Sequence, residues 1–322
     1  MCRSAAIANV TEPALSGTPR RRRSGTRKVG RYSRRSTVEA DPGSARLDVR
    51  PRIGHAAAVG APSLEVATQL GTDPAQPGRF HAHISDDWTI VHVFGGVSMY
   101  ITLRAMREAL HRDDLLPLSC TAMFLAPIPA GPLTIDVDIL RAGRTTTQLT
   151  ADLRVADQTS PALHMQAIFG ATRAAELTYA NVRCPDVPRP NEIAVRRHSP
   201  VVHFNFDDRT EWRPISGLDD PHSTNVLAWE RLQVGEPDLL SLALHSDVLG
   251  LAVEQQGPYT VLSLEIAIRF VAIPTTPWVL QEIEAWHVAD SYATGPARLW
   301  DESGRLCAIV HQTAQVRPMH TS

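Results

Sequence analysis

The chain has 322 residues, enough for one large domain or two domains of ordinary size. With 43% hydrophobic and 20% charged residues, its composition is globular and argues against a wholly disordered chain, a fibrous repeat or a coiled coil. The formal net charge of -2 offers nucleic acid no overall attraction, so nucleic acid is not an expected partner.

Residues 1–62 are rich in Arg, Ser, Gly, Ala and Pro and show no helix or strand period. Within them, residues 1–50 hold twelve basic and four acidic side chains, a local balance of +8. Such a segment buries too little apolar area to offset its ordering entropy, so we expect a disordered leader. The alternatives are a basic arm for nucleic acid or anionic lipid, a transit peptide, and upstream sequence included by a wrong start codon.

Cysteine usage and hydropathy predict a cytoplasmic protein without a membrane span. The four cysteines have no paired spacing, and a chain of this size builds a core without disulfides. No uncharged apolar run reaches about 18 residues, and the N-terminus lacks the apolar core of a signal peptide.

From residue 63 the pattern changes to strands and one long apolar helix. Residues 79–94 predict one or two strands, and residues 95–112 predict a helix that opens after Gly95 and Gly96. Strands separated by Pro, Gly and Asp turns follow at 118–128, 133–143, 146–157 and 162–172.

The second half of the chain repeats this order. Residues 223–234 predict a strand and residues 237–256 a helix. Further strands are predicted at 261–273, 278–290, 295–306 and 307–317.

Three anchors recur at an interval of about 145 residues, which indicates a duplication. The intervals are 146 for Phe124 and Phe270, 145 for Pro132 and Pro277, and 144 for Arg173 and Arg317. We therefore expect two copies of one unit, residues 63–180 and 190–318, packed as a pseudo-dimer.

Both predicted helices are apolar nearly all round, so each should be enclosed by its sheet. The predicted fold is α+β, a double hotdog in which two antiparallel sheets each wrap a long buried helix. Five phrases resemble the double-hotdog acyl-CoA thioesterases, the thioesterase II group: VFGGVSM, ILRAGRTTTQLTADLRVAD, HSDVLG, SLEIAIRF and LWDESGRLCAIVHQTAQVR. The resemblance covers about residues 65–318. It implies hydrolysis of an acyl-CoA substrate to a carboxylic acid and CoA, and a homodimer or higher homo-oligomer of the double unit.

Asp247 interrupts an otherwise apolar helix that should be buried. An ionised carboxylate in such a place is costly unless it is paired or hydrogen-bonded, so its presence needs a reason. One explanation is a carboxylate that caps a break in the helix before Gly250. The family resemblance implies another, in which Asp247 belongs to a trio that activates water.

The resemblance implies Ser263 and Gln312 as the other members of the trio. Asp247 would then be the general base, with the serine hydroxyl and the glutamine amide orienting the water. The alternatives are a hydroxyl in a turn at the start of a strand and an outward-facing strand residue. Glu265 stands where the family often has Asp, a departure that affects local hydrogen bonding without touching the trio.

Gly95 and Gly96 precede the first helix and leave their amides unobstructed. Free N–H groups at a helix N-terminus suit the charge that develops on a carbonyl oxygen, so both glycines are candidate oxyanion or substrate-contact donors. The alternative is that they permit a tight entry into a buried helix.

The duplication provides an internal comparison. The position equivalent to Asp247 falls near Thr102, with no acidic residue before Glu108. We therefore expect one catalytic centre per chain, with the first half contributing a wall, an acyl pocket or CoA contacts.

Other chemistries have weaker support. The segment GVSMY lacks the last glycine of a GxSxG nucleophile elbow, and no phosphate loop or dinucleotide fingerprint occurs. His81 and His83 have no accompanying metal motif, so we expect neither a metal nor an organic cofactor. A non-catalytic acyl-CoA or acyl-chain binding protein is the main alternative. A hotdog hydratase is less favoured, because His245 lies only two residues before Asp247 and should face another side of the helix.

Overall fold

The computed structural model describes residues 63–319 except residues 157, 174–176, 200–201, 219 and 221. These residues all belong to one compact unit, Arg50–Ser322. The predicted leader, residues 1–62, lies outside the described residues. No helix in the described ranges is long and apolar enough to cross a membrane.

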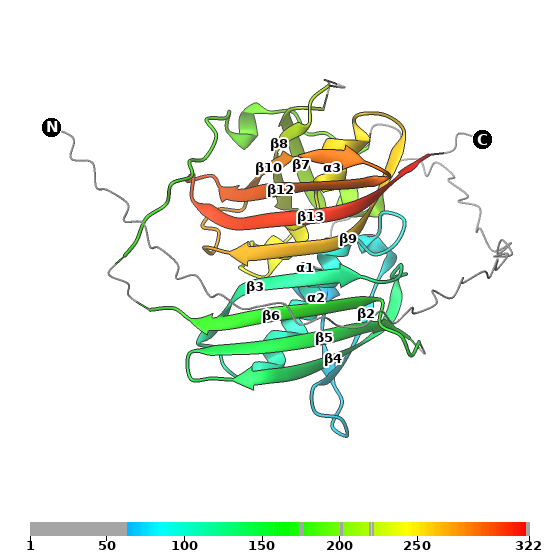
Figure 1. The fold of residues 1–322 in the computed structure, drawn as a ribbon, viewed down its shortest axis with the longest axis vertical. Coiled ribbons are helices and arrows are strands. Elements are labelled where there is room, and N and C mark those ends of the chain that lie inside the picture. Colours follow the sequence, from blue (N-terminus) through cyan, green and yellow to red (C-terminus); the bar gives the residue numbers. More distant parts are fainter. Residues whose placement is uncertain are drawn as a thin grey trace, which may run out of the picture. The chain divides into compact units, whose positions relative to one another are not determined.

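The first half contains one long helix and a set of antiparallel strands (Figure 1). Its elements are the helices α1 (Leu64–Ala67), η1 (Asp86–Trp88) and α2 (Gly95–Leu110), and the strands β1 (Gly71–Thr72), β2 (Arg79–Ile84), β3 (Leu115–Phe124), β4 (Gly131–Ala142), β5 (Thr146–Val155) and β6 (Leu163–Ala171). The predicted elements are present, although the first strand ends at Ile84 and a 3-10 turn follows it.

The second half has the same kind of order, with shorter helices. Its helices are η2 (Pro190–Glu192), η3 (Asn205–Asp208), η4 (Ser241–Ser246) and α3 (Leu249–Glu254). Its strands are β7 (Thr210–Ser216), β8 (Asn225–Leu232), β9 (Tyr259–Phe270), β10 (Val279–Glu284), β11 (His287–Ala289), β12 (Tyr292–Asp301) and β13 (Leu306–Pro318). Strand β7 lies outside every predicted strand.

The strands form one antiparallel sheet in the order β1-β2-β4-β5-β6-β3-β9-β13-β12-β10-β8-β7, with β11 paired to β12. We expected two sheets, but β3 of the first half pairs with β9 of the second and joins them into one, as Figure 1 shows. Outward from this seam, the two halves place equivalent strands in the same order.

The register at the seam reproduces the interval of the sequence repeat. Thr121 on β3 pairs with Ala267 on β9, and these partners are 146 positions apart, as are Phe124 and Phe270. A pseudo-two-fold axis between the two strands would pair each residue near the axis with its own equivalent in the other repeat, and this is the pairing observed. The seam therefore has the geometry of a duplicated unit paired with itself.

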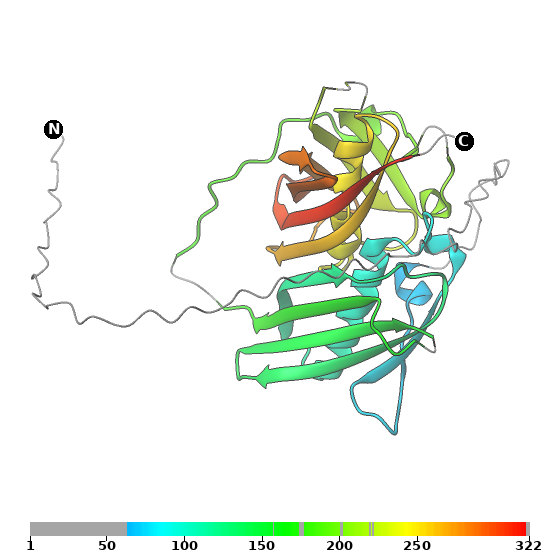
Figure 2. The same ribbon diagram turned by 45° about the vertical axis from the view of Figure 1, so that its right-hand side comes forward.

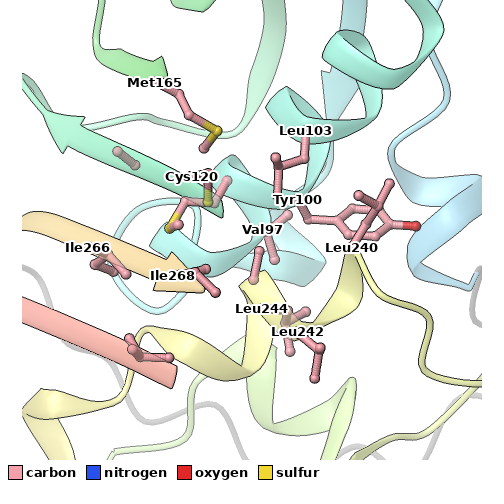
Figure 3. Close-up of a cluster of buried hydrophobic side chains, with 14 of the residues drawn as sticks. Val97, Tyr100, Leu103, Cys120, Met165, Leu240, Leu242, Leu244, Ile266 and Ile268 are labelled. Atoms are coloured by element: carbon pink, nitrogen blue, oxygen red, sulfur yellow. The ribbon is translucent and has the colours of Figure 1, made fainter. Parts of the chain in front are cut away.

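Helix α2 is buried along almost its whole length, as its apolar sequence predicts. Val97, Met99, Ile101 and Leu103 are fully buried, and the helix ends at Leu110, followed by a C-cap residue, His111, in the left-handed conformation. Figure 2 shows α2 on the inner side of the first half's strands, and Figure 3 shows its side chains meeting those of β3, β9 and the η4 segment. The helix thus lies between its own sheet and the second half.

The long second helix expected at 237–256 is absent. In its place η4 and α3 are separated by Asp247 and Val248, whose backbone angles (φ -89, ψ 71 and φ -129, ψ -5) depart from those of a helix. The break directs the Asp247 side chain toward β9 and β13 and exposes the first N–H groups of α3 to side-chain partners. Hydrophobic periodicity continues through the break, so the sequence pattern did not reveal it.

The connection between the halves packs on the outer face of the second half. Val182, Val187 and Ile193 contact a cluster of three tryptophans, Trp229, Trp278 and Trp300. The Trp229 Nε1–H donates to the carbonyl oxygen of Pro188 at 3.0 Å. This part of the outer face is therefore covered by the protein's own chain.

Candidate active site

Asp247, Ser263 and Gln312 lie within hydrogen-bonding distance of one another. The Ser263 hydroxyl donates to Asp247 Oδ1 at 2.7 Å, and Gln312 Nε2 donates to the same oxygen at 2.8 Å. Ser263 lies on β9 and Gln312 on the neighbouring β13, next to a register shift between Thr313 and Ala314. The structure thus brings together all three residues that the family resemblance indicated.

The orientation of the Gln312 amide is fixed by a backbone contact. Its Oε1 accepts from the Leu249 N–H at 3.0 Å, which directs Nε2 toward Asp247 and toward Ser263 Oγ, 2.8 Å away. Gln312 is only 2% exposed, so the alternative interpretation, that it is an outward-facing strand residue, is wrong. It also satisfies one of the free amides at the start of α3.

The capping explanation for Asp247 is also wrong. The helix does break at Asp247, but no side chain caps the N-terminus of α3 from its N-cap position, and Asp247 accepts instead from side chains of β9 and β13 and from amides of α2. Ser263 lies within β9, so the turn hydroxyl considered as its alternative is wrong too.

Gly95 and Gly96 lie beside the Asp247 carboxylate, at the N-terminus of α2. A Cβ on Gly95 would lie 2.3 Å from Asp247 Oδ2, and a Cβ on Gly96 would lie 2.5 Å from the Leu244 carbonyl oxygen. The backbone amides of both glycines face the carboxylate and favour its ionised form. The absence of side chains is therefore what allows α2 to approach η4 and Asp247; the oxyanion role of these amides stays a prediction.

The pKa of Asp247 is raised above its ordinary value. Burial is the largest cause, because it penalises the charged carboxylate, and hydrogen bonds from Ser263, Gln312 and the Gly95 and Gly96 amides counteract it only in part. The result is a carboxylate more basic than one on the surface, which suits the role of a proton acceptor.

The site draws on both halves of the chain. The second half supplies the trio, and the first half supplies the N-terminus of α2 and the ring of Phe124, 3.1 Å from the position of a Gly95 Cβ. Near the position equivalent to Asp247, Thr102 is fully buried and donates to the Ser98 carbonyl at 2.8 Å within α2. The geometry at that position has no acidic group to act as a second base.

A buried hydrogen-bonded network, which the sequence did not predict, lies behind Asp247. It contains Glu230, His198 and Gln281, and it includes His245, two residues before Asp247. The ring of His245 bonds Glu230 at 2.7 Å, which accounts for its burial. No sequence pattern predicts such contacts, because their members come from four separate segments of the chain.

The fold and the site define a hotdog protein with a single acid, hydroxyl and amide cluster at the junction of two repeated halves. The chain belongs to the acyl-CoA thioesterase family: the model of the family's N-terminal domain matches residues 84–170, and that of its C-terminal domain matches residues 182–316. It is accordingly an acyl-CoA thioester hydrolase, as the resemblance implied. No curated protein matches the sequence.

Solved structures share the fold. A candidate thioesterase from Novosphingobium aromaticivorans is 25% identical with a TM-score of 0.68, covering 76% of this chain and 100% of its own. A hotdog protein of unknown function from Alicyclobacillus acidocaldarius is 22% identical with a TM-score of 0.69, covering 80% of this chain and 98% of its own. The acyl-CoA thioesterase II TesB2 from Mycobacterium marinum is 16% identical with a TM-score of 0.65, covering 80% and 99%. The last two likenesses establish the hotdog fold alone.

Proposed function

We propose that the chain hydrolyses an acyl-CoA thioester by direct attack of water, with Asp247 as the general base. The observation that carries the proposal is the convergence of Ser263 Oγ and Gln312 Nε2 on Asp247 Oδ1, at 2.7 and 2.8 Å. A buried carboxylate with a raised pKa, held by two donors of fixed direction, has the properties of a proton acceptor for water.

The proposed reaction needs no covalent enzyme intermediate. Asp247 takes a proton from water while the water oxygen attacks the thioester carbonyl carbon, giving a tetrahedral oxyanion. The carbonyl then re-forms, the carbon–sulfur bond breaks, and the CoA thiolate leaves and takes up the proton. Because the Ser263 and Gln312 side chains hold Oδ1, we assign Oδ2, the oxygen that faces the N-terminus of α2 beside Gly95, as the proton acceptor.

We propose that the amides of Gly95 and Gly96 stabilise the negative charge during this step. Before proton transfer the charge resides on Asp247, which these amides face. After transfer Asp247 is neutral and the charge resides on the carbonyl oxygen, so the same helix N-terminus would stabilise the oxyanion. The total charge near the start of α2 stays constant through the step.

The proposal is tested by measuring the release of free thiol from a series of short, medium, long and aromatic acyl-CoA esters. Asp247→Asn should reduce kcat by about a thousandfold or more, since the general base is lost. Asp290→Asn, in an exposed turn of the same half, is the matched control and should leave kcat unchanged. Circular dichroism would check that both variants keep the fold, and full activity of Asp247→Asn would exclude Asp247 as the base.

The competing function is a non-catalytic protein that binds acyl-CoA or an acyl chain. It predicts a rise in the unfolding temperature with ligand but no thiol release at any chain length. Hydrolysis by the wild-type chain together with its loss in Asp247→Asn would exclude this function.

We also propose an organisation and a setting for the enzyme. The halves at 63–180 and 190–318 would be two hotdog units of a cytoplasmic protein that assembles as a homodimer or a higher homo-oligomer. The equivalent strand order on the two sides of the β3–β9 seam supports the division into units. Light scattering coupled to size-exclusion chromatography would test the assembly, and a monomer at micromolar concentration would contradict it.

A further inference from the structure

We propose that Glu230 is a positioning residue for the reaction: by holding His245, it fixes the segment that presents Asp247 to Ser263 and Gln312. The inference rests on the proposed function, since it concerns the same base. It assigns a role to a buried acid that makes no contact with the trio itself.

Glu230 lies on β8, is 2% exposed and is an acceptor for three donors. Its Oε2 accepts from His245 Nδ1 and from Gln281 Nε2, each at 2.7 Å, and its Oε1 lies 3.3 Å from His198 Nε2. A buried carboxylate needs this many donors to stay ionised. Burial raises the pKa of Glu230, but the hydrogen bonds and charges of His198 and His245 outweigh it and lower the pKa to about 2.

His245 is held at both its ring and its backbone. The ring is fully buried and its Nδ1 bonds Glu230, while its carbonyl oxygen accepts from Gln281 Nε2 at 3.4 Å. Its Nε2 has no hydrogen-bond partner among the described residues, so Glu230 provides the one side-chain bond that orients the ring. The last turn of η4 is thereby fixed two residues before Asp247.

Glu230 and Gln281, which hold the segment before Asp247, are connected to several strands of the sheet. Gln281 lies on β10, and its Oε1 accepts from Trp212 Nε1 on β7 at 3.3 Å. On the other side of the backbone break, Gln312 on β13 accepts from the Leu249 amide. The segment that carries Asp247 is therefore held to the sheet on both sides, by Glu230 and Gln281 before it and by Gln312 after it.

The connection between the halves closes the network. His198, on that connection, bonds Asp207 Oδ1 through Nδ1 at 2.7 Å and stacks on Trp212 with ring centroids 4.8 Å apart. Burial opposes the charge on His198, but hydrogen bonds to Asp207 and Glu230 outweigh it and raise its pKa to about 9. The charge of Glu230 is thus balanced inside the protein.

Two substitutions of His245 separate a specific contact from mere packing. Asn places its Nδ2 where the histidine has Nδ1, so His245→Asn keeps a donor for Glu230, whereas His245→Leu does not. Leu is about as large as His and Asn is smaller, so a role in packing alone would be better preserved by His245→Leu than by His245→Asn. We expect His245→Leu to lower kcat by about a hundredfold with little change in KM, because displacement of a catalytic group by about 1 Å costs about this factor in rate. His245→Asn should keep kcat within about tenfold of wild type, because it keeps the donor.

The direct test is Glu230→Gln, whose single carbonyl oxygen cannot serve all three donors. We expect kcat to fall by about ten- to a hundredfold and the acid limb of the pH profile to move, since the surroundings of Asp247 change. Glu211→Gln is the control: it breaks the buried pairs of Glu211 with Arg213 and Arg231 on β7 and β8 without touching η4. It should lower the unfolding temperature but leave kcat and the pH profile unchanged.

The outcomes distinguish this inference from the proposed function. An inactive wild-type chain would remove the proposed function. An active wild type with equal kcat in His245→Leu and His245→Asn, or an unshifted pH profile in folded Glu230→Gln, would overturn the positioning role alone. If Glu230→Gln does not fold, the His245 pair still decides the question.

Discussion

Asp247 combines two opposing influences within one carboxyl group. Burial favours its neutral form, and four hydrogen-bond donors favour its ionised form. The balance leaves the pKa raised, so single donors to this carboxylate should have measurable effects on the reaction.

Ser263 should be replaceable by Thr but not by Ala. Thr keeps the hydroxyl that donates to Asp247 Oδ1 and suits a β-strand, whereas Ala removes it. We expect Ser263→Ala to lower kcat by about ten- to a hundredfold and Ser263→Thr to keep it within about threefold. Steady-state thiol release measures both, and equal rates in the two variants would show that the hydroxyl is dispensable.

The pH dependence of kcat should report the raised pKa of Asp247. The base must be ionised, so activity should fall as the pH drops through a midpoint above the ordinary 3.8 of an aspartate. In Gln312→Glu a second carboxylate lies beside Asp247, and like charges move the midpoint to still higher pH. A kcat–pH profile checks both variants, and a midpoint at or below 3.8 in wild type would contradict the assignment.

At the scale of elements, the first helix was predicted well and the second was not. Helix α2 is marked by Gly95 and Gly96 at its start and by a continuous apolar run. In the second half a similar run conceals the break at Asp247, because the partners that stabilise the break lie on β9 and β13, remote in sequence. Local periodicity carries no information about such partners.

The start of α2 gives a sharp test of close approach. Gly95→Ala would place a Cβ 2.3 Å from Asp247 Oδ2, so the carboxylate must move, and we expect kcat to fall by about a hundredfold. Gly250→Ala is the matched control, because its Cβ would meet only atoms at 3.7 Å or more, in ordinary contact. Near-wild-type activity of Gly95→Ala would show that the carboxylate has more room than the structure gives it.

The trio was found through the family resemblance, whereas the positioning network was not found at all. Asp247 stood out in the sequence as a lone acid among apolar residues, and Ser263 and Gln312 were matched to family phrases. Glu230 and His245 gave no such signal, because a buried pair from a strand and a helix has no fixed spacing. Strand β7 was missed as well, since Arg213 and Pro214 break its apolar alternation.

At the scale of the whole molecule, His198 links the connection between the halves to the catalytic half. Its pKa of about 9 lies above the ordinary 6.5, so its stabilisation is complete below pH 6.5 and is lost as the pH rises through 9. We expect wild type to lose on the order of 2 to 3 kcal/mol of unfolding free energy over this range relative to His198→Gln. Urea unfolding at several pH values measures the difference, and parallel curves for the two proteins would contradict it.

The tryptophan cluster under the connecting segment bears on self-association. Trp229, Trp278 and Trp300 would otherwise present a sticky aromatic surface, yet the chain lays its own Val182–Ile193 stretch across them. A second copy of the chain could contact these tryptophans only if it first displaced that stretch.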